Sequence, residues 1–185
     1  MSQQTTHIDG LIKLCLTGNR AAQLEIYNRY YKGMYNVSLR IVKDSMIAED
    51  VMQESFLSAL TKLDTFRGEV SFGAWLKRIV VNNSIQQYKK QLKRQETDLS
   101  DVLYKVEDHE GYIPDSGDDG RKAQKVIDTM KLLKDNYRIS LTLHLIEGYD
   151  YGEISEIMNI SYANCRTMIS RAKDSLRDKL IVTLK

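Results

Sequence analysis

The sequence predicts an all-α protein of two small helical domains, joined by a flexible acidic linker, with a helix-turn-helix in the second domain. The 185 residues include a single proline, the residue that most strongly breaks helices. Apolar residues recur at three- and four-residue spacing through most of the chain, which is the period of a buried helical stripe. We expect the first domain at 1–95, the linker at 96–121 and the second domain at 122–185.

The first domain is expected to contain four helices, at residues 8–17, 20–43, 46–64 and 72–94. Asp44 or Ser45 is a candidate cap for the third helix, and Ser71 for the fourth. The expected core stripes of the second, third and fourth helices are Leu24, Tyr27, Tyr31, Met34 and Ile41; Ala48, Met52, Phe56, Ala59 and Leu63; and Phe72, Trp75, Leu76 and Ile79. The last stripe continues as Asn82, Asn83 and Gln86, so we expect that half of the fourth helix to leave the core.

Charge separates the two domains from the stretch between them. Residues 1–95 carry a net charge of +6, residues 96–120 a net charge of −8, and residues 121–185 a net charge of +4. The middle stretch also contains Pro114 and three glycines, a composition typical of a linker extended by its own like charges. Basic domains suit a polyanionic partner, because lysine and arginine displace counterions from phosphates.

The second domain is expected to form helices at 122–135 and 137–147, followed by a helix-turn-helix. Asp150 and Glu153 match a capping box for a short helix. A three-residue break at 159–161 then precedes a last helix from about Tyr162 to Leu180. Its apolar side (Cys165, Ile169, Ala172 and Leu176) is expected to pack on Ile154, Ile157 and Met158.

The opposite side of the last helix carries polar and basic residues that suit a DNA major groove. They are Arg166, Thr167, Ser170 and Arg177, with Arg171 and Lys173 on the flanks. The alternative is a helical hairpin with a solvated basic face.

Two further exposed faces are expected in the first domain. Asp50, Gln53, Glu54 and Leu57 lie opposite the core stripe of their helix, a mixture that suits a partner helix; the alternative is a solvated face. Residues 77–94 hold six basic residues and no acid, and amides beside them can read base edges. Phe66, Arg67 and Phe72 can stack on an unpaired base, although Phe72 and Trp75 also suit a plain core.

Other residues exclude several classes of function. Cys15 and Cys165 are far apart and show no ligand spacing, which predicts neither a disulfide framework nor a metal site. The three histidines are scattered, and no nucleophile, base or phosphate loop assembles. We therefore predict no enzymatic activity, no cofactor and no small-molecule substrate. No signal peptide or membrane span is recognised, which predicts a cytoplasmic protein.

Three runs in this order resemble the extracytoplasmic-function (ECF) sigma factors of bacterial RNA polymerase. Residues 48–60 (AEDVMQESFLSAL) resemble the polymerase-docking helix, and residues 66–85 (FRGEVSFGAWLKRIVVNNSI) resemble the segment that melts and reads the −10 element. Residues 147–176 resemble the −35-reading helix-turn-helix. The resemblance implies a transcription initiation factor that binds core polymerase and promoter DNA.

Carried over by position, the resemblance implies three sets of site residues. Asp50, Gln53, Glu54 and Leu57 would contact the clamp helices of the β′ subunit. The −10 element would meet Phe66, Arg67, Arg78, Asn82, Gln86 and Lys89, and the −35 element would meet Arg166, Thr167, Ser170, Arg171 and Lys173. The linker would thread toward the active-site channel of the polymerase. An anti-sigma factor, membrane-anchored in some members of the family, is a further expected partner.

Two other functions fit parts of the sequence. A conventional operator-binding regulator would explain the helix-turn-helix, but it predicts a dimerisation seam that the sequence does not show. A helical adaptor that binds only protein leaves the acid-free basic helix at 77–94 unexplained.

Overall fold

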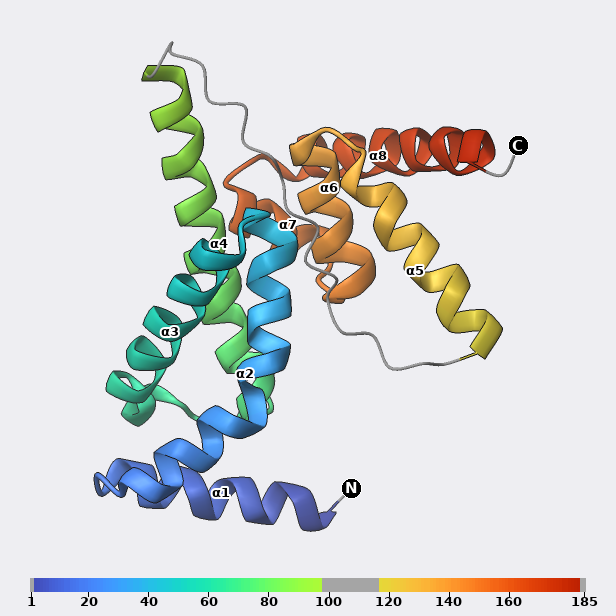
Figure 1. The fold of residues 1–185 in the computed structure, drawn as a ribbon. Helices are drawn as coiled ribbons and strands as arrows, with labels where there is room; N and C mark the ends of the chain where they lie inside the picture. The colour runs from blue at the N-terminus through green and yellow to red at the C-terminus, as the bar shows by residue number, and fades with distance from the viewer. Residues whose placement is uncertain (1, 98–116, 184–185) are drawn as a thin grey trace. The chain divides into compact units, whose positions relative to one another are not determined.

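The chain divides into two compact helical units, Met1–Glu107 and Asp108–Lys185. The computed structural model describes residues 2–97 and 117–183 (Figure 1). Within those ranges all regular structure is helical, which confirms the predicted all-α class with two helical domains. Most of the predicted linker at 96–121 lies outside the described residues. Within them, no helix is long and apolar enough to cross a membrane.

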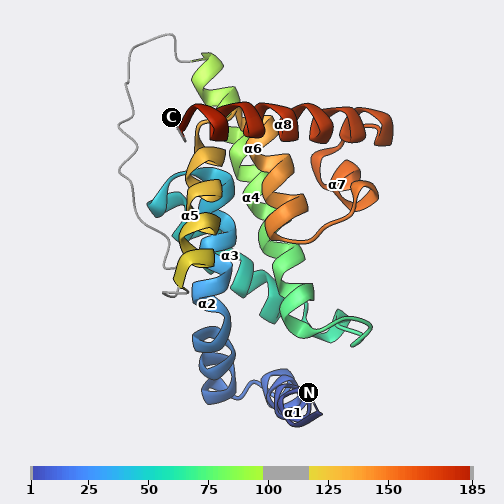
Figure 2. The ribbon, with the colours of Figure 1, turned by 90° about the vertical axis from the view of Figure 1, so that its right-hand side faces the viewer.

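The first unit is built around three helices that pack side by side. They are α2 (Arg20–Val42), α3 (Ser45–Thr61) and α4 (Phe72–Thr97), with a short 3₁₀ turn, η1 (Leu63–Thr65), after α3. Helix α1 (Ser2–Leu16) packs against α2 and η1, across the start of α2 (Figures 1 and 2). The three long helices therefore form the body of this unit.

Local sequence signals set where these helices begin. Asp44 Oδ1 accepts a hydrogen bond of 2.9 Å from the backbone N–H of Ile47, and Ser71 Oγ accepts one of 3.2 Å from the N–H of Ala74. Both bonds satisfy N–H groups that a helix leaves unpaired in its first turn. The caps predicted for the third and fourth helices are therefore present.

The core stripe predicted for α3 is correct, whereas two other expectations for this unit are wrong. Ala48, Met52, Phe56, Ala59 and Leu63 are all buried. Leu24, by contrast, is 58% exposed, because it lies on the side of α2 away from α3 and α4.

The predicted departure of α4 from the core is also wrong. Val80, Val81 and Ile85 are buried, and Ser84 is fully buried among them. The apolar stripe shifts from Ile79, which is only half-buried, to Val80. A serine continues the buried stripe because its hydroxyl is hydrogen bonded to the Val80 carbonyl oxygen at 2.7 Å.

The second unit contains α5 (Gly117–Lys131), α6 (Asp135–Leu141), a π-helical turn η2 (Thr142–Ile146), α7 (Tyr151–Met158) and α8 (Tyr162–Thr183). Helices α5, α6 and α7 all pack against α8. Helix α5 begins five residues before the position expected, within the predicted linker, because acidic residues are favourable in the first turn of a helix. The helix expected at 137–147 is α6 continued by η2.

The predicted helix-turn-helix is present as α7, a tight turn and α8. The capping box of α7 is complete: Asp150 Oδ1 accepts from the Glu153 N–H at 2.8 Å, and Glu153 Oε2 accepts from the Asp150 N–H at 2.9 Å. Asn159 ends α7 with φ of 56°, a left-handed conformation that asparagine tolerates better than most residues. The predicted packing residues of α8, Cys165, Ile169, Ala172 and Leu176, are buried, as is Ile154 on α7.

Candidate functional site

The outer face of α3 carries all four side chains predicted to dock on a partner. Asp50, Gln53 and Glu54 are exposed, and Leu57 is 68% exposed. Gln53 Nε2 donates to Glu49 Oε1 at 3.2 Å, one helical turn away. An exposed leucine among carboxylates and an amide provides apolar area for a partner helix, ringed by polar groups that set its orientation.

Met46 extends this outer face and was missed by the sequence analysis. It is 77% exposed, and the positions 46, 50, 53 and 57 fall at the three- and four-residue spacing of one helix face. The same spacing could have identified it in the sequence. We define the docking face as Met46, Asp50, Gln53, Glu54 and Leu57.

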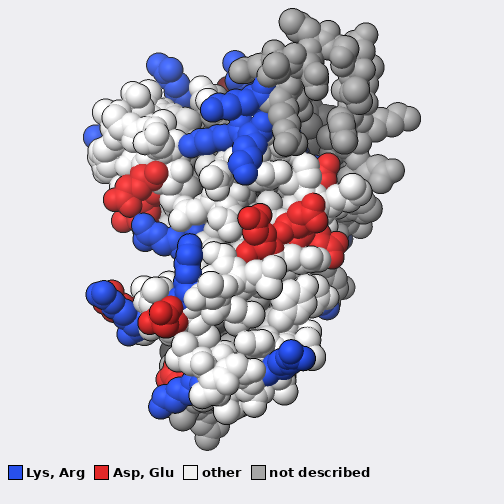
Figure 3. Space-filling view, turned by 90° about the vertical axis from the view of Figure 1, so that its left-hand side faces the viewer, with Lys and Arg blue, Asp and Glu red and all other residues white. Residues whose placement is uncertain are grey.

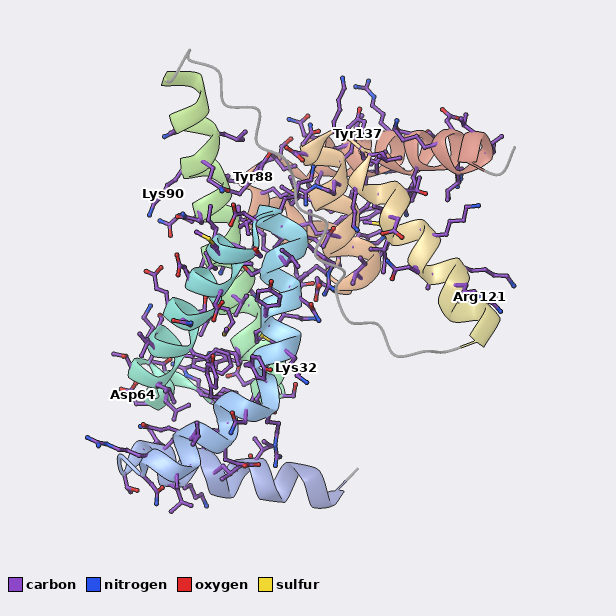
Figure 4. The ribbon with its side chains drawn as sticks, in the orientation of Figure 1. Lys32, Asp64, Tyr88, Lys90, Arg121 and Tyr137 are labelled. Carbon is purple, nitrogen blue, oxygen red and sulfur yellow. The ribbon has the colours of Figure 1, made fainter. Side chains whose placement is uncertain are left out.

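A second exposed face runs along α4. Arg78, Asn82, Gln86 and Lys89 are exposed, and at 100° per residue they fall within about 80° of one another. Lys90 extends outward from α4 nearby (Figure 4). We call these four residues the α4 face.

Charge on the side of the molecule drawn in Figure 3 is unevenly spread. Basic side chains gather in the upper part of the view, and acidic side chains lie across its middle. On the α4 face itself, two amides alternate with basic residues. This composition suits base edges flanked by phosphates.

The residues predicted to stack on an unpaired base belong to an aromatic cluster. The Phe66 ring centroid lies 5.7 Å from that of Phe72 and 5.4 Å from that of Trp75, and Phe72 also contacts Tyr30 at 5.4 Å. Phe72 is only 4% exposed, so the structure favours the core alternative for it. Phe66 and Trp75 are half-buried, and Arg67 is exposed. A base contact by Phe66 or Arg67 stays a prediction.

Two features hold this cluster closely packed. A Cβ atom at Gly73 would lie 2.9 Å from Cε1 of Tyr30, so the first turn of α4 approaches the ring closely only because residue 73 is glycine. Burial raises the pKa of Tyr30, and the positive charge of Arg29 opposes that shift. The Tyr30 phenol therefore stays protonated at neutral pH.

In the second unit, α8 carries the third predicted face. Arg166, Thr167, Ser170 and Arg171 are exposed. Thr167 Oγ1 donates to the Ala163 carbonyl at 3.0 Å, which leaves its methyl group to face outward. Arg177, further along the same side, pairs with Asp174 at 2.8 Å.

Lys173 differs from the other members of that set. Its side chain is half-buried, and its Nζ lies 5.9 Å from the centroid of the Tyr151 ring on α7. The His144 ring lies 4.9 Å from the same tyrosine. A cation at this distance is attracted by the ring face, so the structure places Lys173 on the α7 side of α8.

Two exposed residues at the start of α8, Tyr162 and Asn164, were not selected from the sequence. The first turn of the second helix in a helix-turn-helix contacts base edges, and this rule could have identified them. The two thiols, by contrast, are buried at Cys15 and Cys165, and burial raises the pKa of each. Both therefore pack as protonated, apolar groups.

Comparison with known proteins places all three faces within recognised segments. The family model of sigma-70 region 2 matches residues 26–94, and that of sigma-70 region 4 matches residues 123–176. The docking face and the α4 face lie in the first segment, and the exposed side of α8 lies in the second.

Full-length relatives and solved structures agree with this assignment. The ECF RNA polymerase sigma-E factor of Haemophilus influenzae is 29% identical over 191 residues, covering 97% of this chain and 98% of that protein. SigM of Bacillus subtilis strain 168 is 29% identical over 153 residues, covering 83% of this chain and 91% of that protein.

Two solved structures share the fold at lower identity. The sigma factor RpoE in complex with the anti-sigma factor NepR from Bartonella quintana has a TM-score of 0.62 at 20% identity, covering 85% of this chain and 96% of that chain. CnrH in complex with the cytosolic domain of CnrY has a TM-score of 0.55 at 21% identity, covering 93% and 96%. With both sigma-70 regions matched in order and relatives that span nearly the whole chain, this protein belongs to the ECF group of sigma factors.

Proposed function

We propose that this chain binds core RNA polymerase and directs it to promoters, reading the −10 element with its first unit and the −35 element with its second. The observation that carries the proposal is the placement of two nucleic-acid faces in separate compact units, each matched by one sigma-70 region. An operator-binding regulator would need only the face on α8, and a protein adaptor would need neither. The docking face on α3 and the α4 face then serve recruitment and strand opening.

Polymerase docking is assigned to the docking face on α3. Burying Leu57 against a partner helix would contribute about 1.5–3 kcal/mol. Asp50 and Glu54 beside it present negative charge to the partner, which speeds encounter and sets orientation. We propose the clamp helices of β′ as that partner.

The −10 element is assigned to the α4 face together with Phe66 and Arg67. Asn82 and Gln86 are the base-reading candidates, because an amide can pair with a base edge through a donor and an acceptor at once. Arg78 and Lys89 would hold the phosphates on either side. Arg67 is exposed in the loop before α4, where it can reach a base flipped out of the strand.

The −35 element is assigned to Arg166, Thr167, Ser170, Arg171 and Lys173. Arg166 and Ser170 lie within about 40° of each other on α8, at the centre of its exposed side. Such a helix enters the major groove with its first turns, where an arginine can form two parallel bonds to guanine. Lys173, held beside Tyr151, is placed for phosphate rather than for a base.

The remaining partners follow from this role. We propose regulation by an anti-sigma factor, since both solved relatives described above are held by one. A membrane-anchored anti-sigma factor would keep the chain at the inner face of the membrane until a signal releases it. The chain itself would act in the cytoplasm, without catalysing a reaction or binding a cofactor.

The test is run-off transcription by core polymerase from a promoter library, with and without the purified chain. We expect new start sites that share two sequence elements, one near −35 and one near −10. Unchanged start sites, or no association with core polymerase, would refute the proposal.

Arg166→Ala is expected to weaken binding to a −35 duplex by about 1–3 kcal/mol and to relax specificity at one base pair. The measurement is binding of the full chain to duplexes that carry each single base-pair change. Arg121→Ala is the matched control, because it removes the same charge from the exposed surface of α5 (Figure 4). Equal losses in the two variants would show that Arg166 contributes only charge.

Asn82→Ala is expected to relax base preference at one position of the −10 element, at a discrimination of about 1–3 kcal/mol. The measurement is initiation from a library randomised across that element. Lys89→Ala is the contrast, since loss of a phosphate contact weakens all sequences alike. An unaltered preference in Asn82→Ala would remove that residue from the base-reading set.

A further inference from the structure

A single hydrogen bond between side chains joins α3 to α4 beneath their exposed faces. Asn83 Nδ2 lies 2.9 Å from Ser55 Oγ, across 28 positions of sequence. Ser55 is fully buried and directly follows Glu54 of the docking face. Asn83 is half-buried and directly follows Asn82 of the α4 face. One contact thus lies one residue away from each of two functional surfaces.

The chemistry of Ser55 gives this bond one direction. Its hydroxyl donates to the Val51 carbonyl oxygen at 2.6 Å, so its only proton is already used. The oxygen can then only accept, and the NH₂ group of Asn83 must face α3. The amide is therefore held in one orientation.

A second polar contact holds α4 to a different neighbour. The hydroxyl oxygens of Ser84 and Ser38 are hydrogen bonded at 3.0 Å, which ties α4 to α2. Successive residues on a helix point about 100° apart, so Asn83 faces α3, Ser84 faces α2 and Asn82 faces away from both. Only the Asn83 contact reaches the helix that carries the docking face.

Apolar packing alone would leave the rotation of α4 loosely defined. Val80, Val81 and Ile85 fill the core beside these contacts, but the hydrophobic effect has no direction. A hydrogen bond weakens steeply when its geometry is distorted. The directional contact at Asn83 therefore limits how α4 can turn or slide along α3.

We propose that Asn83 is a positioning residue, whose bond to Ser55 sets the rotation of α4 relative to the polymerase-bound α3. In that rotation Asn82 and Gln86 meet the −10 element once the docking face is bound. The inference rests on the proposed function, and it assigns to two residues with no expected contact to DNA or polymerase a role in promoter opening.

The experiment compares Asn83→Ala, Ser55→Ala and the double variant with the wild-type chain, each assembled with core polymerase. Affinity for core polymerase, unfolding temperature, permanganate reactivity of the opened −10 strand and base preference across the −10 element are measured at a temperature where every variant is folded. We expect core affinity to stay within about two-fold of wild type, because the docking face is untouched. We expect strand opening to fall about ten-fold in either single variant, no further in the double, and base preference at −10 to change.

Ser84→Ala is the matched control, because it removes a buried hydroxyl contact of α4 that does not reach α3. It is expected to lower the unfolding temperature and to leave base preference unchanged. Additive losses in the double variant, or strand opening that follows unfolding temperature alike in Asn83→Ala and Ser84→Ala, would overturn the inference while wild-type initiation upholds the proposed function. Absence of initiation by the wild-type chain would instead overturn both.

Discussion

Asp50→Lys combined with Gln53→Ala is expected to reduce promoter-dependent transcription by at least about a hundred-fold, since like charges set against each other at an interface cost several kcal/mol. Both residues are exposed at the centre of the docking face, beside Leu57. Neither contributes to the core of the first unit, so the fold should be retained. Run-off transcription and direct binding to core polymerase are the measurements.

Asp64→Lys provides the control for charge alone. Asp64 is exposed on η1, near the end of the first unit where α1 lies (Figure 4), and its substitution makes the same change of charge outside the docking face. It should leave transcription near the wild-type rate. Both proteins should also bind a −35 duplex normally. Wild-type transcription by the double variant would contradict the assignment of α3 to polymerase.

Ile169→Ala is expected to destabilise the second unit by about 2–5 kcal/mol, the usual cost of such a truncation in a packed core. Ile169 is fully buried on α8, on the side that packs against the other helices of the unit. A unit of this size has little stability to lose, so binding to a −35 duplex should largely disappear. Urea unfolding followed by circular dichroism measures the loss of stability.

The neighbouring substitution Ser170→Ala separates stability from recognition. Ser170 is exposed on the same helix, and such surface changes shift stability by no more than about 0.5 kcal/mol. It should unfold like the wild-type chain while altering −35 binding. Retention of polymerase binding by Ile169→Ala is also expected, because the docking face lies in the other compact unit. Equal stability of the two variants would show that the packing of α8 is looser than the structure indicates.

The features that could be predicted from the sequence are those set by neighbouring residues. The capping box at Asp150 and Glu153 and the turn at Asn159 each depend on a few consecutive positions. The core stripe of α3 was also correct, because apolar residues recur there on one face only. Short-range signals of this kind carry their own geometry.

The features that could not be predicted depend on which side of a helix its neighbours cover. Leu24 fits an apolar stripe yet is exposed, and Asn83 fits an exposed amide face yet is bonded to Ser55, 28 positions away. The contact of Lys173 with Tyr151 likewise joins two helices. A single sequence does not encode such pairings in any local pattern, since tertiary packing decides them.

Helix α7 has only eight residues, a length of about 12 Å and far below what an isolated helix needs to persist in water. The DNA-reading hairpin is therefore not portable: a synthetic peptide that spans α7 and α8 would lack the support that α5 and α6 give to α8. That scaffold leaves the outward positions of α8 free to vary without loss of folding. A lineage, or an engineer, can thus change the preferred promoter by exchanging a handful of surface side chains and keeping the rest of the unit.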